Sequence, residues 1–139
     1  MLNRRALLFA AALLTLTACG QTQPPTVVVN AWSPAAPPGA TVVAVYGEIS
    51  ARQDDVLLRI AAPSATSAEL HETSEENGMM KMRPVTRLEL KAGTPVQLAP
   101  GGMHVMLMGM QEAFAPGAQI PITFEFEQAG EVSVMAQVK

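Results

Sequence analysis

The chain has 139 residues, about half of them hydrophobic, and a formal net charge of −3 at pH 7. Without residues 1–18 it keeps seven basic and twelve acidic residues, and a net charge of −5 makes nucleic acid a poor partner. The roughly 120 residues that remain suffice for one domain with a buried core, and the single cysteine excludes a disulfide within the chain.

The first eighteen residues are typical of an export signal. Arg4 and Arg5 precede an apolar run over residues 6–16, which is too short for a stable membrane span. The small residues before Cys19 resemble a lipobox, so we expect removal of residues 1–18, lipidation of Cys19 and a flexible tether over residues 19–26. Cleavage nearby that leaves a free thiol is the alternative. The lipoprotein interpretation anchors the domain, residues 27–139, outside the cytoplasm at a membrane surface.

Hydrophobic residues alternate with period two along the rest of the chain, which favours strands over helices. Val56, Leu58 and Ile60 form one such row, and every second residue from 120 to 126 forms another. Turn pairs such as Asn77-Gly78 separate these rows, and the pattern predicts a single all-β domain, an antiparallel β-sandwich. One helical turn is expected at residues 111–115. The candidate strands are 26–32, 41–50, 55–61, 67–74, 79–90, 95–98, 103–110, 119–127 and 131–138.

Both histidines of the chain belong to one spaced pattern with two methionines. Ten residues separate His71 from Met82, and one residue separates His104 from Met106. Twenty-one residues lie between these two pairs. Either residue type alone is more often structural, but a pattern that uses every imidazole of the chain indicates a metal site.

Local geometry gives each pair a reason to share a face. A two-residue turn at Asn77-Gly78 would set Thr73 opposite Met82, so that His71 and Met82 become diagonal neighbours. His104 and Met106 share a face because they are two residues apart on one strand. Whether the second pair lies beside the first is not determined by the spacing.

The ligand types favour monovalent copper. Thioether sulfur is soft and prefers copper(I) to zinc or calcium, and neutral imidazole suits several transition metals. Methionine forms no disulfide, so the set suits an oxidising compartment. We expect one copper(I) ion, with Met80 and Met108 as possible additional sulfurs. The other methionines are assigned to packing, and the glutamates near His71 to a solvated hairpin face.

These residues resemble the PCuAC family of periplasmic copper chaperones, whose site has the same four ligand types at the same intervals. Asn30-Ala31-Trp32 and the segments around both pairs are also similar to that family. The resemblance implies a cupredoxin-like sandwich that carries copper toward the dinuclear copper centre of cytochrome c oxidase, with subunit II as acceptor and a Sco-type thiol protein as collaborator. Glu72 replaces a methionine that many relatives have, and the chain lacks the histidine- and methionine-rich tail of some relatives.

Other functions remain as alternatives. A general copper storage or resistance lipoprotein would use the same ligands, whereas a zinc-binding protein or hydrolase would use His71, His104 and a glutamate. An electron-transfer cupredoxin would need a thiolate at the copper, and Cys19 lies at the expected anchor. A purely structural lipoprotein would need no metal. We expect a monomeric carrier and no enzyme.

Overall fold

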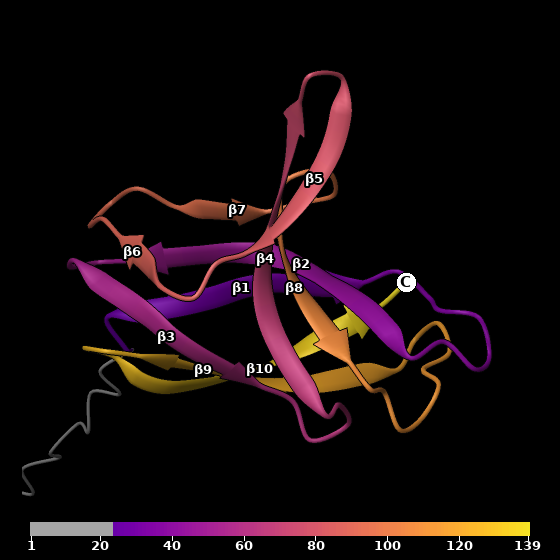
Figure 1. Cartoon of the computed structure of the whole chain (residues 1–139). Helices are drawn as coiled ribbons and strands as arrows, with labels where there is room; N and C mark the ends of the chain where they lie inside the picture. Colours follow the sequence, from indigo (N-terminus) through magenta and orange to yellow (C-terminus); the bar gives the residue numbers. More distant parts are fainter. Residues whose placement is uncertain (1–23) are drawn as a thin grey trace, which may run out of the picture.

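The computed structural model describes residues 24–139, and the expected signal peptide, Cys19 and most of the tether lie outside them. Ten strands make up the described chain: β1 (Thr26–Ser33), β2 (Val42–Ala51), β3 (Asp55–Ala61), β4 (Ser67–Glu76), β5 (Met79–Pro84), β6 (Leu88–Leu90), β7 (Val96–Leu98), β8 (Met103–Met108), β9 (Gln119–Phe126) and β10 (Gly130–Val138). Figure 1 shows their arrangement. The all-β prediction is confirmed.

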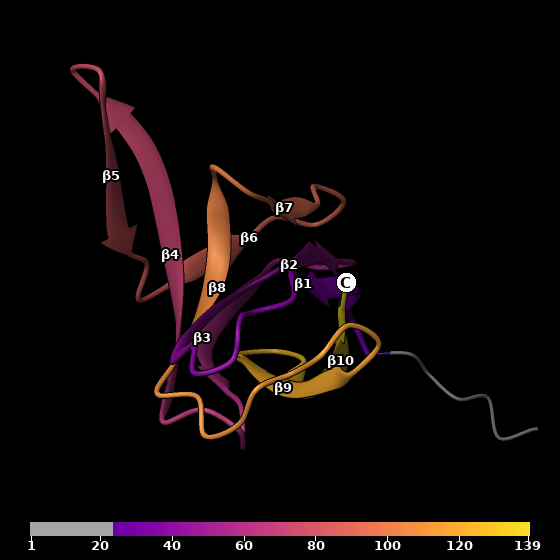
Figure 2. The same cartoon turned by 90° about the vertical axis from the view of Figure 1, so that its right-hand side faces the viewer.

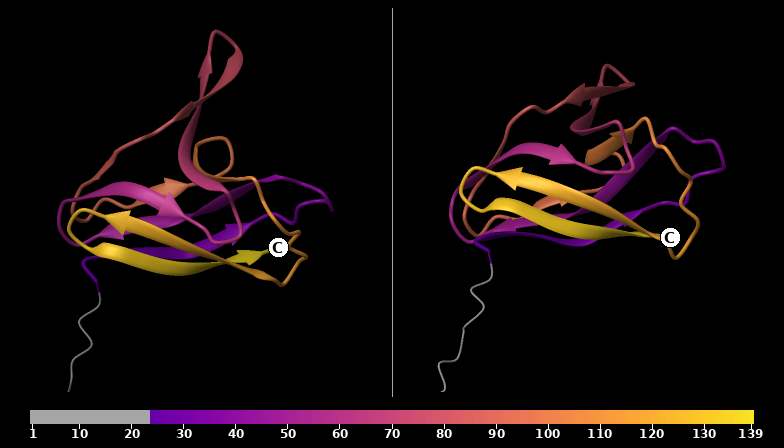
Figure 3. Two further views of the ribbon diagram at one scale, coloured as in Figure 1. Left: turned by 60° about the horizontal axis from the view of Figure 1, so that its bottom comes forward. Right: turned by 90° about the horizontal axis from the view of Figure 1, so that it is seen from below.

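The strands follow the order β5-β4-β8-β2-β1-β10-β9-β3-β6, and β7 pairs with β2. Because β3 also pairs with β4 at Ile60 and Ala68, the sheet folds back on itself into a sandwich. All pairings are antiparallel except that of β1 with β10, which is parallel. The β4–β5 hairpin projects beyond the body of the sandwich, as Figures 2 and 3 show from other directions.

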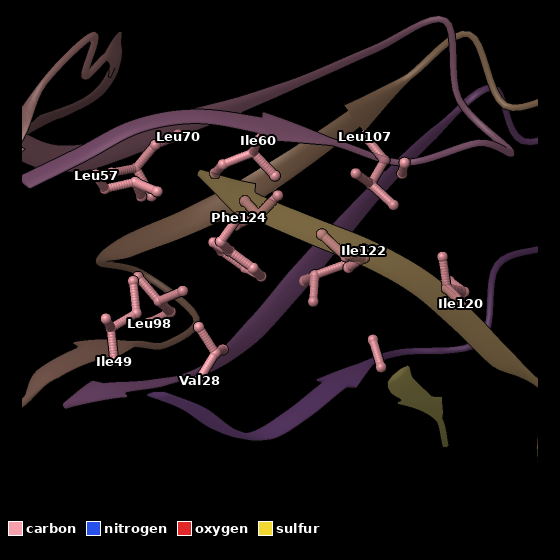
Figure 4. Packing of buried hydrophobic residues seen from close by; sticks show 14 of the residues in the cluster. Val28, Ile49, Leu57, Ile60, Leu70, Leu98, Leu107, Ile120, Ile122 and Phe124 are labelled. Carbon is pink, nitrogen blue, oxygen red and sulfur yellow. The ribbon is translucent and has the colours of Figure 1, made fainter. Parts of the chain in front are cut away.

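The core lies between the folded halves of the sheet and is aliphatic, with two stacked phenylalanine rings, Phe124 and Phe126. As predicted, β9 turns Ile120, Ile122 and both phenylalanines inward, and each is nearly fully buried. Figure 4 shows β9 side chains packed toward residues of β1, β2, β3, β4, β7 and β8. Burying this apolar surface is the main stabilising contribution to the fold.

The alternation predicted for β3 is wrong in detail. Leu57 and Ile60 are buried, whereas Leu58 is exposed. The pairing with β9 shifts between Leu57 and Arg59, and this bulge inserts one residue, so two residues three positions apart face the core. A period-two pattern does not contain that information.

The structure also differs from the prediction at residues 79–90 and at residues 111–115. The expected strand 79–90 is broken after Pro84, because the amide of Val85 donates to the carbonyl of Leu70 and the chain then crosses from β4 to pair with β3 as β6. Residues 111–115 form bends and irregular chain instead of a helical turn, since Pro116 disfavours helical dihedrals at the preceding residue. Thr26, which the prediction counted both as the end of the tether and as the start of strand 26–32, is fully buried as the first residue of β1.

Candidate metal centre

His71 and His104 lie directly opposite each other on the neighbouring strands β4 and β8. Their ring centroids are 6.1 Å apart. The His104 residue is 5% exposed and the His71 side chain is 15% exposed. The tertiary structure therefore brings together the two imidazoles, which spacing alone left apart.

Both histidines point away from the core. Leu70 and Val105, one residue before His71 and one after His104, are opposite each other and buried. Successive side chains of a strand alternate between faces, so the imidazoles occupy the outer face of the sandwich. The site is thus a surface site whose rings are nevertheless shielded from solvent.

The predicted hairpin register is confirmed. Asn77 and Gly78 have φ of 53° and 76°, as a type I′ turn requires, and Thr73 lies opposite Met82. Met82 is therefore a diagonal neighbour of His71 on the outer face. Met82 is 50% exposed, so its thioether is accessible to solvent.

Met106 also shares this face, because it lies opposite Glu69 and two residues after His104. The two methionines thus flank the histidine pair from opposite ends. In a flat sheet their backbones would be roughly 16 Å apart, too far for both sulfurs to reach one ion. Binding by both therefore requires twisting or bending that brings β5 toward β8.

Glu69 holds the His71 ring. Oε2 of Glu69 lies 3.0 Å from Nε2 of His71 and accepts a hydrogen bond from it when Nε2 carries the ring proton. The Nδ1 atom of His71 is buried and has no hydrogen-bond partner among the described residues, a condition shared only with Oγ of Ser64. This arrangement leaves the lone pair of Nδ1 free, and a carboxylate on the other ring nitrogen is the usual support of a metal-binding histidine.

A backbone carbonyl orients His104 in the same manner. Nδ1 of His104 lies 3.0 Å from the carbonyl oxygen of Gly102, to which it donates when Nδ1 is protonated, and Nε2 then carries the lone pair. Tyr46 packs beside this ring with centroids 6.3 Å apart, and Trp32 lies 4.9 Å from Tyr46. Nζ of Lys139 lies 5.4 Å from the Trp32 ring centroid. A row of two aromatic side chains, Trp32 from β1 and Tyr46 from β2, therefore packs beside the His104 ring.

Two supporting residues were missed from the sequence. Glu69 was assigned to a solvated face, although its position two residues before His71 places it on the same face of a strand. Tyr46 was given no role, because its contact with His104 depends on the pairing of β2 with β8. The first could have been found from alternation, whereas the second is visible only in the folded chain.

The two candidate additional sulfurs lie on the site's face. Met80 is opposite Glu75 and two residues before Met82, and Met108 is opposite Ser67 and two residues after Met106. Met108 is half-buried, whereas Met80 is 61% exposed. Met110 is buried and Met103 packs against the core, as expected, but Met79 and Met135 are exposed.

Within residues 24–139, the His, Cys, Asp and Glu side chains form no group of three or more arranged to hold a metal ion. That portion of the chain also contains no helix with the length and hydropathy needed to cross a membrane.

Residues 26–138 match the model of a family described as LpqE-like lipoproteins. The chain belongs to the LpqE-like family. A relative from Leifsonia xyli subsp. xyli, named "Putative lipoprotein Lxx21020", is 33% identical, and the match covers 97% of this chain and 89% of the relative. The similarity to this relative extends over most of the length of both chains.

Several solved structures are similar to this LpqE-like chain. One is described as the copper-bound PCuAC domain from PmoF2, with a TM-score of 0.69, 26% identity and coverage of 83% of this chain and 92% of that one. Another is the solution structure of CuI-DR1885 from Deinococcus radiodurans, with a TM-score of 0.66, 33% identity and coverage of 88% and 83%. The predicted resemblance to PCuAC and the cupredoxin-like sandwich are confirmed.

Proposed function

We propose that the chain is an extracytoplasmic carrier of copper(I), which binds one ion through His71, Met82, His104 and Met106. The observation that carries the proposal is the facing imidazole pair, in which each ring has one nitrogen held by an oxygen and the other left for a metal. Thioethers flank this pair on the same face. Similarity to domains described as copper-bound and CuI-loaded supports the same cargo.

The ligand set suits a carrier better than an enzyme. Neutral thioethers and imidazoles leave the positive charge of copper(I) uncompensated, so an acceptor with thiolate ligands can withdraw the ion. Met82 is half-exposed, which gives such an acceptor access to one side of the site. No step of this transfer requires a change in the oxidation state of copper.

We further propose that a lipid on Cys19 holds the carrier at the outer side of a membrane, where copper enzymes are assembled. The lipoprotein description of the family and of the Leifsonia relative supports this location. The acceptor proposed is subunit II of cytochrome c oxidase, which houses its dinuclear copper centre, with a Sco-type thiol protein as collaborator. The domain is proposed to act as a monomer.

The test is an anaerobic titration of the mature chain, carrying Cys19→Ser to remove the competing thiol, with copper(I) in the presence of bathocuproine disulfonate. One ion per chain is expected, and Met82→Leu and Met106→Leu should each weaken its retention. Preference for zinc over copper(I), or unchanged copper retention in both leucine variants, would refute the proposal. Transfer to purified subunit II distinguishes delivery from storage, since a storage protein would keep its ion.

Ligation of one ion by both methionines would tie β5 to β8. Amide hydrogen exchange in β5 is therefore expected to slow by about tenfold when copper(I) is bound, because the bound ion opposes local opening of the hairpin. Copper-loaded protein with unchanged exchange in β5 would show that Met82 does not take part in binding.

A further inference from the structure

We infer that Met80 is a transfer ligand, a second thioether that receives copper(I) from the main site and presents it to an acceptor. The inference rests on the proposed function and adds a residue and a direction to it. Its basis is the hairpin formed by the outer part of β4 and β5, which projects from the sandwich (Figures 1 and 2). This hairpin carries exposed methionines on both of its faces, Met79 on one and Met80 and Met82 on the other.

Register places Met80 on the outward path from the site. Met80 and Met82 are two residues apart on β5 and lie opposite Glu75 and Thr73 respectively, so both share the face that carries His71. Residues two apart on a strand are about 7 Å apart at the backbone, a separation that two flexible methionine side chains can bridge with a single ion. The sulfur of Met80 is therefore the next soft donor beyond Met82 toward the hairpin tip.

Exposure indicates the direction of transfer. All six residues of β5 are exposed, with Met80 at 61% and Met82 at 50%, whereas Met106 and Met108 at the other end of the site are half-buried. An acceptor can therefore approach the site most easily from the hairpin.

The charges of the hairpin are sorted by face. Lys81 and Arg83 alternate with the two methionines and both pair with Glu76 on the opposite face, the lysine at 2.7 Å. No cation of β5 therefore lies beside Met80 and Met82. The path from the site carries the two neutral sulfurs and, opposite Met80, the Glu75 side chain, and none of these groups repels a monovalent cation.

The step is a ligand exchange without a redox change. Sδ of Met80 donates a lone pair to copper(I) as the bonds from the ion to Met106, His104 and His71 break in turn, so the ion is held between Met80 and Met82. A donor atom of the acceptor then forms its bond as the bond to Met82 breaks, and release from Met80 completes the transfer. Copper remains monovalent throughout.

The experiment compares Met80→Leu with Met79→Leu, because Met79 is 62% exposed and adjacent but lies on the opposite face. Leucine keeps the apolar bulk and removes the sulfur. Copper(I)-loaded protein is mixed with bathocuproine disulfonate in a stopped-flow instrument, and equilibrium affinity is measured by competition. Met80→Leu is expected to keep wild-type affinity and to transfer about tenfold more slowly, whereas Met79→Leu transfers at the wild-type rate.

Three results would overturn the inference: transfer by Met80→Leu at the wild-type rate, equal slowing by Met79→Leu, or a loss of affinity as large as that of Met82→Leu, which would make Met80 a resident ligand. Failure of the proposed function looks different, because the wild-type protein would then retain no copper(I) for any variant to transfer.

Discussion

Two polar clusters of the domain, around Asp55 and around His71, differ in how completely their atoms are paired. The Asp55 carboxylate is 3% exposed and accepts hydrogen bonds from the Thr26 hydroxyl and from the amides of Val56, Gln128 and Ala129. It joins the starts of β1 and β3 to the β9–β10 turn. The His71 ring, in contrast, has one nitrogen paired and one buried nitrogen unpaired.

The difference separates a structural group from a binding group. Burial of a polar atom costs free energy unless a hydrogen bond replaces its water, so a fully paired carboxylate stabilises the fold. A buried nitrogen without a partner is tolerated at a cost, and binding of a metal would recover it. Substitutions in the first cluster should therefore change stability, and substitutions in the second should change copper affinity.

Replacement of Asp55 should have the largest effect. Asp55→Ala removes the acceptor and leaves four donors unpaired, and a loss of about 3 kcal/mol in the free energy of unfolding is expected. Urea denaturation followed by far-UV circular dichroism measures it. Copper affinity of the folded fraction should be unchanged, and a parallel loss of affinity would show that the two clusters are coupled.

His104→Ala tests the other side of the comparison. Loss of a buried ligand should weaken copper(I) binding by about 100-fold, equivalent to roughly 2.7 kcal/mol. Competition with bathocuproine disulfonate gives the affinity, and urea denaturation gives the stability of the metal-free variant. A variant that binds copper normally would remove His104 from the site.

Glu69→Gln addresses the support of His71 and should have a smaller effect. The amide keeps an acceptor oxygen but loses the negative charge, and supporting partners of metal ligands typically change affinity by about tenfold or more. We expect a drop of about tenfold in copper(I) affinity with unchanged urea stability. Glu72→Gln, on the opposite face of β4, is the matched control and should leave affinity intact.

Protonation of the Asp55 carboxylate at acid pH should give the smallest change in stability among these tests. Its burial raises the pKa of this carboxyl, but the hydrogen bonds from Thr26 and the three amides outweigh that cost and hold the pKa below its ordinary value of 3.8. A lowered pKa in the folded state stabilises the protein above about pH 4, and this stabilisation is lost as pH falls from there through the lower pKa of the folded state.

The contribution of Asp55 to the free energy of unfolding should therefore be level between about pH 7 and pH 5 and should fall below about pH 4. The backbone amide of Ala92 and the charge of Lys91 also lower the pKa of the exposed Asp54, so Asp54→Asn serves as control. Asp55→Asn should flatten the acid dependence more than Asp54→Asn does. Equal flattening would show that Asp55 contributes no more to the acid response than the exposed Asp54 does.

Much of the domain was predictable because local rules determined it. The alternation of hydrophobic residues identified β9 correctly, because its pairing with β10 has no register shift that would interrupt the period of two. The Asn77-Gly78 turn determined the hairpin register that places Met82 diagonal to His71. Spacing selected the four candidate ligands, and the two members of each pair lie on one face as expected. In each case the relevant contacts are near in sequence, so chain geometry decides them.

The sequence by itself determined the strand content, the hairpin and the candidate ligand types. Only the tertiary structure decided that His71 faces His104, that Tyr46 supports the second ring and that the bulge in β3 turns Leu57 and Ile60 inward together. These outcomes depend on which strands become neighbours. That choice is made by burial of the whole core, to which residues distant in the chain contribute and which no local pattern encodes.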